Sequence, residues 1–391
     1  MEQNMKLKKI IWVTTIPASL QFFKGQLRFL SGSFSIIVTS SGASQLYQFA
    51  KKENIQAHFL PMKRQISLWF DIYSLLLFIV YFFKERPVAV HGNTPKASLL
   101  SMLAAKLTNV PVRIYMCHGL RYQGSSGIMK KLLMTMERLS CSCATEVLCV
   151  SEGIRKTLIT DNICDPSKSK VILYGSANGI DLNLFDPARI DISGLRAQIG
   201  IPDADFVFLF VGRIVKDKGI NELVGAFNRL SKKYTNISLL LVGAEEKKLN
   251  PISEEASLVI KQNLKIFAVG RKEDVKPYML LSDAFVLPSY REGFGMVLIE
   301  AGALGKPCIT TDIIGCNEII IPNENGVIIP SKDEEALYRA MENFLLHPEE
   351  VQRMAKKARP LVASRYDQKI VWEALLKEYK RIIEHKKSFI L

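Results

Sequence analysis

Two carboxylic acids stand out in residues 291–309, whose sequence is REGFGMVLIEAGALGKPCI. Glu292 lies in a glycine-containing turn, and Glu300 lies in an apolar run with the pattern of a helix. A buried carboxylate needs hydrogen-bond donors, and a hydrogen bond to a charged group contributes about 1.5–3 kcal/mol. We expect Glu300 to bind ribose hydroxyls and Glu292 to bind hydroxyls of a second sugar. The alternative is a helix N-terminal acid together with one structural buried acid.

Groups suited to a phosphate follow the predicted strand FVFLFV, residues 206–211. The next segment, GRIVKDKG, places Gly212 and Arg213 at the strand end and Lys218 near the start of a helix. Cations beside the free N–H groups of a helix N-terminus bind phosphate, although surface charge alone explains such a motif equally well. The spacing of a Walker loop is absent. In the turn before the second predicted helix, close backbone approach to a ligand is expected at Gly293, Phe294, Gly295 and Met296.

Apolar, β-branched runs alternate with helical patterns along the chain, which predicts doubly wound α/β layering with parallel sheets. The expected strands are Lys9–Val13, Phe34–Thr39, Ala89–His91, Arg113–Cys117, Glu146–Val150, Val171–Leu173, Phe206–Val211, Ser238–Val242, Leu264–Phe267, Ala284–Leu287 and Cys308–Thr310. We predict two Rossmann-like domains, 1–185 and 205–370, joined by a linker at 186–204. Residues 371–391 are expected to form an amphipathic helix, which packs on the second domain or reaches back to the first.

The charge distribution points to an anionic partner of the first domain. The chain of 391 residues has a formal net charge of +14, and residues 1–185 hold 22 Lys and Arg against 10 Asp and Glu. Nucleic acid, an acidic bilayer surface and a phosphorylated substrate all fit this excess, as does a basic surface that only confers solubility. The 7 cysteines are odd in number and lie mostly in apolar sequence, so we expect them to be reduced and buried.

Two apolar segments resemble targeting or membrane sequences. The stretch from Met5 resembles a secretory signal, but Thr14 and Thr15 interrupt it and no cleavage site follows, so a buried first strand is expected. In residues 66–83, Asp71 leaves an apolar run shorter than the roughly 20 residues of a spanning helix. We expect a core or interfacial helix there. Trp69, Tyr73 and Tyr81 fit either a bilayer surface or a buried position.

Taken in order along the chain, these motifs resemble the retaining glycosyltransferases of family 4, which have the GT-B fold of two Rossmann-like domains facing a cleft. The resemblance covers the whole chain. It rests on the acid pair after SYR, on Arg213 and Lys218, and on NGID at 178–181. It implies that Glu292 contacts the donor sugar, that Glu300 binds the ribose, and that Arg213 and Lys218 hold the diphosphate.

The resemblance also implies roles for residues that carry little signal of their own. His118, at a predicted strand end in VRIYMCHGLR, matches a histidine placed near the donor sugar. Gly270 and Arg271 match the usual base-binding loop. The family needs no metal or other cofactor, and the D-x-D string of Asp203 and Asp205 lies in the linker, so we interpret it as accidental.

By resemblance, the acceptor binds to the first domain and is a polyprenyl diphosphate-linked saccharide of bacterial capsule or O-antigen synthesis. The donor is a nucleotide sugar, UDP-linked by family habit, that supplies a hexose or N-acetylhexosamine. Candidate acceptor residues are Lys24, His91, Thr94, Lys96 and Arg121. We expect a cytoplasmic protein attached peripherally to the inner face of the membrane, without a nucleic-acid partner.

Other functions fit parts of the sequence. A nucleotide-sugar epimerase shares the GT-B architecture, and a nucleic-acid-binding protein would use the basic half, although no RNP-type pattern is present. An NAD-dependent oxidoreductase would need a G-x-G-x-x-G after a strand, which neither half has. An inactive, scaffold-like member of the family is a further alternative, although both acids and both cations are present.

Overall fold

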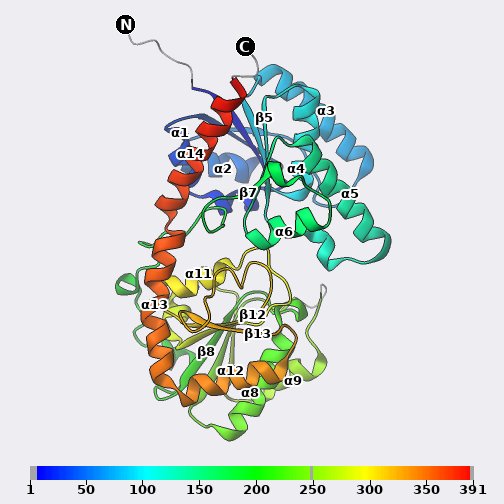
Figure 1. The fold of residues 1–391 in the computed structure, drawn as a ribbon. Coiled ribbons are helices and arrows are strands. Elements are labelled where there is room, and N and C mark those ends of the chain that lie inside the picture. The colour runs from blue at the N-terminus through cyan, green and yellow to red at the C-terminus, as the bar shows by residue number, and fades with distance from the viewer. Residues whose placement is uncertain (1–6, 247–249, 388–391) are drawn as a thin grey trace. The chain divides into compact units, whose positions relative to one another are not determined.

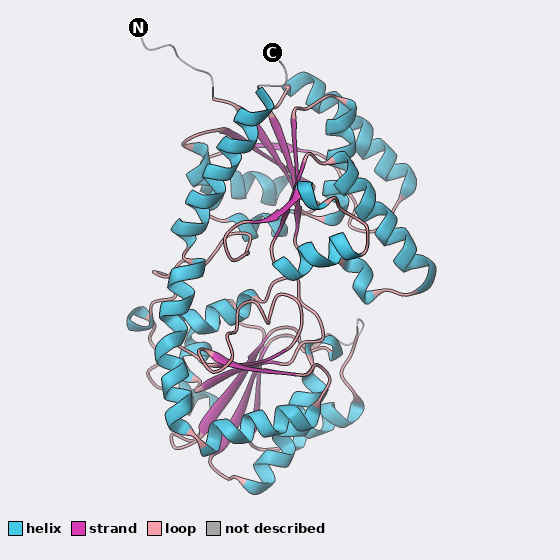
Figure 2. Cartoon of the chain, in the orientation of Figure 1, coloured by secondary structure: helices cyan, strands magenta, loops and turns pink. Residues whose placement is uncertain are grey.

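The computed structural model describes residues 7–246 and 250–387 and divides the chain into two compact units. The first unit comprises residues 1–179 together with 369–391, and the second comprises residues 180–368. The segment 186–204, which we expected as a linker, therefore belongs to the second unit. In both units, helices cover the two faces of one sheet (Figures 1 and 2).

The first unit contains a seven-stranded parallel sheet with the strand order β3-β2-β1-β4-β5-β6-β7. Its strands are β1 Lys9–Val13, β2 Ser35–Ser40, β3 Gln56–Phe59, β4 Ala89–Gly92, β5 Val112–Cys117, β6 Glu146–Cys149 and β7 Ser169–Val171. Its helices are α1 Gln26–Ser31, α2 Ala43–Glu53, α3 Leu68–Glu85, α4 Pro95–Leu107, α5 Gly127–Cys143, α6 Glu152–Thr160 and all but the first residue of α14 Gln368–Lys387.

The second unit contains a six-stranded parallel sheet with the order β10-β9-β8-β11-β12-β13. Its strands are β8 Phe206–Val211, β9 Ile237–Val242, β10 Ile266–Gly270, β11 Ala284–Leu287, β12 Cys308–Thr311 and β13 Gly326–Ile329. Its helices are α7 Leu195–Ile199, α8 Ile220–Lys233, α9 Glu254–Gln262, α10 Lys276–Leu281, α11 Met296–Ala303, α12 Glu334–Leu346 and α13 Pro348–Tyr366.

Eleven strands were expected from the sequence, and the structure adds the edge strands β3 and β13. In β3, the sequence QAHF is short and at least partly exposed, so it lacks the apolar run that marks a buried strand. β7 begins and ends two residues earlier than expected, because Leu173 adopts a positive φ of 51° that no strand allows. The fold class itself is confirmed, with two parallel Rossmann-like sheets.

The C-terminal helix α14 packs on the first unit, which decides between the two alternatives that its sequence left open. Its apolar stripe is buried at Leu375, Tyr379 and Ile382. The indole of Trp372 donates a hydrogen bond of 2.7 Å to Asn178, and Glu378 forms an ion pair of 2.7 Å with Lys170. The chain thus returns to the first unit after completing the second.

Candidate active site

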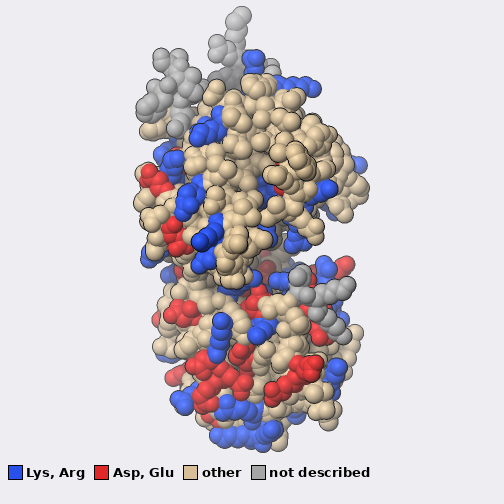
Figure 3. All heavy atoms as spheres, turned by 90° about the vertical axis from the view of Figure 1, so that its right-hand side faces the viewer, with Lys and Arg blue, Asp and Glu red and all other residues tan. Residues whose placement is uncertain are grey.

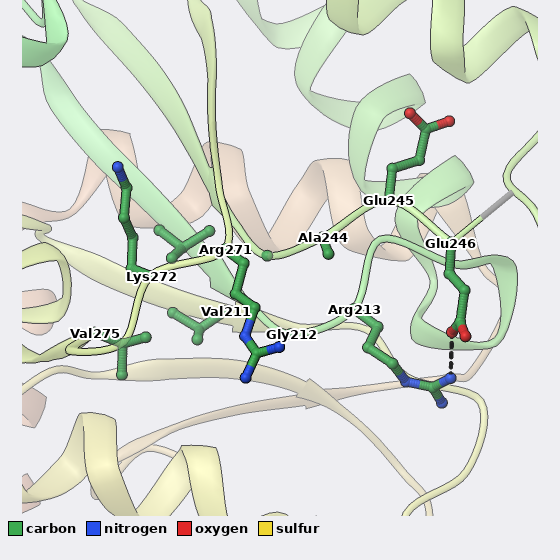
Figure 4. Close-up of a pocket in the computed structure, with 11 residues that line it drawn as sticks. Val211, Gly212, Arg213, Ala244, Glu245, Glu246, Arg271, Lys272 and Val275 are labelled. Atoms are coloured by element: carbon green, nitrogen blue, oxygen red, sulfur yellow. Dashed lines mark hydrogen bonds and ion pairs between the residues drawn. The ribbon is translucent and has the colours of Figure 1, made fainter.

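A pocket of about 410 Å³ opens at the carboxyl ends of β8, β9 and β10 in the second unit (Figure 4). This is the edge of a parallel α/β sheet at which ligands usually bind. It is lined by Val211, Gly212, Arg213, Val242, Gly243, Ala244, Glu245, Glu246, Arg271, Lys272 and Val275. The aliphatic residues form an apolar floor, and the charged residues surround it. Such a lining suits a flat aromatic group that is joined to an anion.

The floor of the pocket depends on a close approach between two backbone segments. A Cβ atom on Gly243 would lie 1.7 Å from the carbonyl oxygen of Gly212, so no larger residue fits there without moving the strand ends apart. The N–H of Gly243 donates a hydrogen bond of 2.9 Å to the carbonyl of Gly270. This hydrogen bond joins Gly270 to the backbone of Gly243, and the next residue, Arg271, lines the pocket.

Arg213 and Arg271 extend to the same side of the strand ends, whereas Glu245 points the other way (Figure 4). Arg213 is more than half exposed and forms an ion pair of 2.6 Å with Glu246. An exposed guanidinium has several further donors, so an anion can bind to Arg213 while that pair persists. Glu246 was not expected from the sequence, because an acid after β9 carries no motif of its own.

Lys218 and Glu292 are brought together from loops that are 74 residues apart in sequence. The ammonium of Lys218 donates to Glu292 Oε1, which also accepts a hydrogen bond of 2.9 Å from the hydroxyl of Ser289. None of the described residues donates to the second carboxylate oxygen, Oε2. Glu292 thus offers one oxygen to a ligand, and Lys218 has two further N–H donors.

A tight turn at Gly219 places the loop of Lys218 against the loop of Glu292. Gly219 has a φ of +70°, and a Cβ atom there would lie 2.0 Å from the carbonyl oxygen of Pro288. Two further contacts join the same loops. The N–H of Tyr290 donates to the carbonyl of Asp217 at 2.9 Å, and Arg291 forms an ion pair of 3.2 Å with the Asp217 carboxylate.

Neither Ser289, Tyr290 nor Asp217 was expected from the sequence. The hydroxyl of Tyr290 also donates to Glu222 on α8 at 2.6 Å, so the turn is held to the helix as well as to the loop. These contacts depend on which loops lie side by side, and sequence spacing does not contain that information. Of the three residues, Ser289 had the clearest sequence signal, because it follows the end of a predicted strand.

Gly293, Phe294 and Gly295 lie in the turn that leads from β11 to α11, and Met296 is the first residue of that helix. The N–H of Gly295 donates to the carbonyl of Gly315 at 2.9 Å, which fixes the turn. The ring of Phe294 packs edge-on against Tyr366, with ring centroids 5.9 Å apart. The side chain of Phe294 is therefore part of the packing, and only its backbone is suited to contact a ligand.

Glu300 lies on α11 and is partly buried, and no described residue donates a hydrogen bond to its carboxylate. Burial raises the pKa of Glu300 to about 7, against the opposing effect of the positive charge of Lys276. An enclosed carboxyl group without donors is costly in a folded protein and is often found at a functional site. This is the arrangement expected of a group whose donors are supplied by a ligand.

His118 follows β5 in the first unit, and its Nε2 atom is buried without a described hydrogen-bond partner. Burial lowers the pKa of His118 to about 4, so the ring is neutral at pH 7. Its ring packs edge-on against Phe23, with centroids 5.7 Å apart. A neutral imidazole with an unpaired nitrogen is suited to a hydrogen bond with a ligand.

The five acceptor candidates fall into two groups. Lys24 and Arg121 are exposed, and Thr94 is half-buried, with its hydroxyl bound to Thr15 at 2.6 Å. His91 and Lys96, by contrast, occupy packing positions.

His91 is 1% exposed and stacks on Trp12, with ring centroids 3.8 Å apart. Lys96 is buried and forms an ion pair of 2.7 Å with Asp71. Their positions argue against direct contact with an acceptor, because the ring of His91 lies inside the core and the charge of Lys96 is already neutralised by Asp71.

Asp205 of the D-x-D string has a structural role, and the cysteines lie in the packed interior. Asp205 is buried, accepts a hydrogen bond of 2.7 Å from Ser238 and forms an ion pair of 3.0 Å with Lys265, whereas Asp203 is exposed. All 7 cysteines are free and buried. In the described part of the chain, no three His, Cys, Asp or Glu side chains gather closely enough to hold a metal ion.

Comparison with known proteins extends over nearly the whole chain. The family pattern of the glycosyl transferases group 1 matches residues 191–360, and that of glycosyltransferase family 4 matches residues 33–184. The capsular polysaccharide biosynthesis glycosyltransferase CapM of Staphylococcus aureus is 34% identical over 382 residues, which cover 97% of this chain and 99% of CapM.

Two further relatives are described as transferases acting on lipid-linked sugars. The UDP-Gal:alpha-D-GlcNAc-diphosphoundecaprenol alpha-1,3-galactosyltransferase of Escherichia coli is 28% identical, over 74% of each chain. The N,N'-diacetylbacillosaminyl-diphospho-undecaprenol alpha-1,3-N-acetylgalactosaminyltransferase of Campylobacter jejuni is 26% identical, over 76% of this chain and 77% of its own.

The fold has close counterparts among solved structures. A glycosyltransferase from Rickettsia africae superposes with a TM-score of 0.81 at 21% identity, over 96% of this chain and 99% of the other. The Anabaena protein HepE, solved in complex with UDP and glucose, superposes with a TM-score of 0.78 at 18% identity, over 96% of this chain and 100% of HepE. From its full-length similarity to CapM, together with the two family patterns, the chain belongs to glycosyltransferase family 4 and is a glycosyltransferase with the GT-B fold.

Proposed function

We propose that this glycosyltransferase moves a hexose or an N-acetylhexosamine from a UDP-linked sugar to a polyprenyl diphosphate-linked saccharide, in the synthesis of a bacterial surface polysaccharide. The observation that carries the proposal is the grouping of Lys218, Glu292 and Ser289 at the same sheet edge as the pocket beside Arg213. The relatives named above, which include a capsular enzyme and two enzymes of diphosphoundecaprenol-linked sugars, support the choice of acceptor.

In this proposal, different site residues bind different parts of the donor. The apolar floor of the pocket and Arg271 hold the base, and Glu300 accepts hydrogen bonds from the ribose. Arg213 and Lys218 hold the diphosphate, and Glu292 Oε2 binds a hydroxyl of the sugar. His118, on the first unit, has a neutral ring nitrogen that is suited to a hydrogen bond with a ligand.

The reaction then joins the acceptor oxygen to the anomeric carbon while the bond from that carbon to the phosphate oxygen breaks. The nucleoside diphosphate leaves with its electron pair, and the acceptor proton passes to a departing phosphate oxygen, with retention of configuration. Negative charge develops on the leaving group, so the cations beside it are the main catalytic groups. Each is expected to contribute about 2.7–4 kcal/mol, as oxyanion-hole donors do. No metal ion takes part in this scheme.

The acceptor places the enzyme at the inner face of the cell membrane, as a peripheral protein. None of the helices in the described ranges has both the length and the apolar character needed to cross a bilayer. The excess of Lys and Arg in residues 1–185 supports attraction to an anionic surface or an anionic lipid diphosphate.

The test is release of nucleoside diphosphate by the purified protein across a panel of nucleotide sugars, with and without polyprenyl diphosphate-linked saccharides. Glu292→Ala and Glu300→Ala are compared with Glu349→Ala, a matched acid that is 70% exposed on α13. Acceptor-dependent release that is lost in the first two variants and kept in the third supports the proposal. Turnover without an acceptor would favour a nucleotide-sugar epimerase, and failure to bind any nucleotide sugar would refute the donor site.

A further inference from the structure

Helix α3 carries a continuous apolar stripe on the side that faces solvent. Exposed side chains recur there at the spacing of one helix face, at Trp69, Ile72, Tyr73, Leu76, Val80 and Phe83. Trp69 is 84% exposed and Val80 is 66% exposed. Over 14 residues at 1.5 Å each, the stripe is about 20 Å long. A surface helix of a water-soluble domain normally presents polar residues on this side.

The opposite face of α3 is also apolar and is already used. Phe78, Tyr81 and Phe82 are buried in the first unit, where α3 packs against α4. The ion pair of Lys96 with Asp71 joins α4 to the first turn of α3, and Asp71 also accepts a hydrogen bond of 3.1 Å from the N–H of Ser67. The outward stripe is therefore held in a fixed orientation, and its exposure does not result from a loose helix.

Helix α5 packs against α4, as α3 does, and it also carries exposed apolar residues. Its exposed residues include Ile128, at 87%, and Met129 and Leu132. In Figure 3, which views the molecule from the side of α3 and α5 in Figure 1, this side of the first unit carries few charged residues over a broad area, with Lys and Arg mostly toward its margins. Exposed apolar side chains gathered on neighbouring helices in this way are typical of an interaction site.

The charges next to this surface have a single sign. In residues 61–86 and 121–139, every exposed charged side chain is basic; these are Lys63, Arg64, Lys84, Arg86, Arg121, Lys130, Lys131 and Arg138. The acids of the same segments are less exposed and have partners: Asp71 pairs with Lys96, Glu85 with Lys9, and Glu137 with the hydroxyl of Tyr115. The rim of the apolar surface is thus positive.

We propose that the outward face of α3, together with the exposed start of α5, docks on an anionic lipid bilayer, with the helix lying flat at the interface. Apolar side chains with Trp and Tyr among them, surrounded by Lys and Arg, have the composition of an interfacial helix. A second copy of this chain is the less suitable occupant, because a two-fold interface would bring one basic rim against another. The inference deepens the proposed function, since a membrane-bound acceptor makes such docking useful, but it stands on the exposed residues themselves.

The direct test uses the three tryptophans of the full chain. Trp12 is fully buried, Trp372 is partly buried and bound to Asn178, and Trp69 is the exposed one. Vesicles of phosphatidylglycerol and phosphatidylethanolamine should shift the emission of Trp69 to the blue, and brominated lipids should quench it. Both effects should disappear in Trp69→Phe and weaken as salt is raised. An unchanged spectrum with anionic vesicles would overturn the proposal.

The second test measures co-sedimentation with the same vesicles. The triple variant Trp69→Ser, Leu76→Ser, Val80→Ser should bind at least about tenfold more weakly, since one buried aromatic or aliphatic side chain already accounts for about that factor. The matched control is Leu258→Ser, Leu264→Ser, Leu346→Ser, which removes three exposed leucines of the second unit. Equal binding by the two variants would refute the docking face.

The remaining measurements separate this inference from the proposed function. Transfer to a short-chain, water-soluble acceptor should be the same in the triple variant and the wild type, which also shows that the variant is folded. If the wild type shows no transfer to this acceptor, the proposed function is refuted, whereas the proposal for the docking face is unaffected. A dimer in solution that the triple variant dissociates would show that a second copy covers the stripe, and the membrane proposal would fall.

Discussion

Lys218 donates a hydrogen bond to Glu292 in an ion pair whose side chains are only 20% and 16% exposed. The pair joins the loop after β8 to the loop after β11, so two segments distant in sequence form one site. A charge pair shielded from water in this way leaves an uncompensated charge when either partner is removed.

Lys218→Met is therefore expected to lower the free energy of unfolding by about 1–3 kcal/mol and kcat/KM by about 100-fold. Adding Glu292→Gln should recover part of the stability, because no lone charge remains, but none of the activity. Urea unfolding and donor turnover measure the two effects. The exposed pair Lys357 and Glu324, at 46% exposure each, is the control and should show a coupling of about 0.2–1 kcal/mol. Equal coupling in the two pairs would contradict a special environment for Lys218.

Gly219→Ala should disrupt the site by separating its two loops. The new Cβ atom would meet the carbonyl oxygen of Pro288 at 2.0 Å, in addition to the strain of a positive φ. Gly194→Ala is a matched control, since Gly194 has nearly the same φ, +69°, but nothing within 4 Å of its Cβ position. The control should lose roughly 1–2 kcal/mol from the backbone alone. Gly219→Ala should lose more stability and most of its turnover; similar losses in both variants would show that the contact with Pro288 is unimportant.

The ionisation of Glu300 is expected to make the folded protein less stable as pH rises. Its pKa is about 7 in the folded state, against 4.5 for an unperturbed glutamate. The favourable contribution of the protonated form is complete below pH 4.5 and is lost as pH rises through 7. Glu300→Gln should therefore gain stability relative to the wild type between these values, by roughly 3 kcal/mol at most. Urea unfolding at about pH 5 and about pH 8.5 measures this, with the exposed Glu349→Gln as control. A pH-independent difference would show that Glu300 has an ordinary pKa.

Donor binding should release a proton through the same residue. Hydrogen bonds from ribose hydroxyls favour the charged carboxylate, so they lower the pKa of Glu300 from about 7. At pH 7, binding of the nucleoside diphosphate should release about half a proton from the wild type and none from Glu300→Gln. Calorimetry in buffers of different ionisation enthalpy gives this number. Proton uptake by the wild type would mean that the carboxyl group binds the ligand in its protonated form.

Substitution of Asp205 should destabilise the protein more than substitution of Asp203. Neither substitution should change how the activity depends on metal ions. Asp205→Asn weakens a buried hydrogen bond and an ion pair, and should lower the free energy of unfolding by about 2–3 kcal/mol. Asp203→Asn, at an exposed position, should change it by less than about 0.5 kcal/mol. Turnover below the unfolding temperature should be unaffected by either change and by EDTA. Activity that needs a divalent ion and both aspartates would show that the D-x-D string is a metal site.

The sequence by itself determined the fold class and the positions of most strands along the chain, and it supplied the candidate residues for the donor site. These features leave local signals, because buried parallel strands are apolar runs and strand ends are marked by glycines and charges. Arg213, Lys218 and Glu292 were named from their places after strands, and Glu300 from its place in an apolar helical run; their roles in binding a donor stay predictions.

Only the tertiary structure decided which of these residues have partners and which surfaces are covered. The hydrogen bonds of Ser289 and Tyr290 and the burial of His91 and Lys96 depend on contacts between distant segments, which local patterns do not encode. The same holds for residues 66–83, where the sequence allowed a core or an interfacial helix. Packing of one face against α4 left Trp69 and Tyr73 exposed and Tyr81 buried, because a helix can present only one of its faces to a single neighbour.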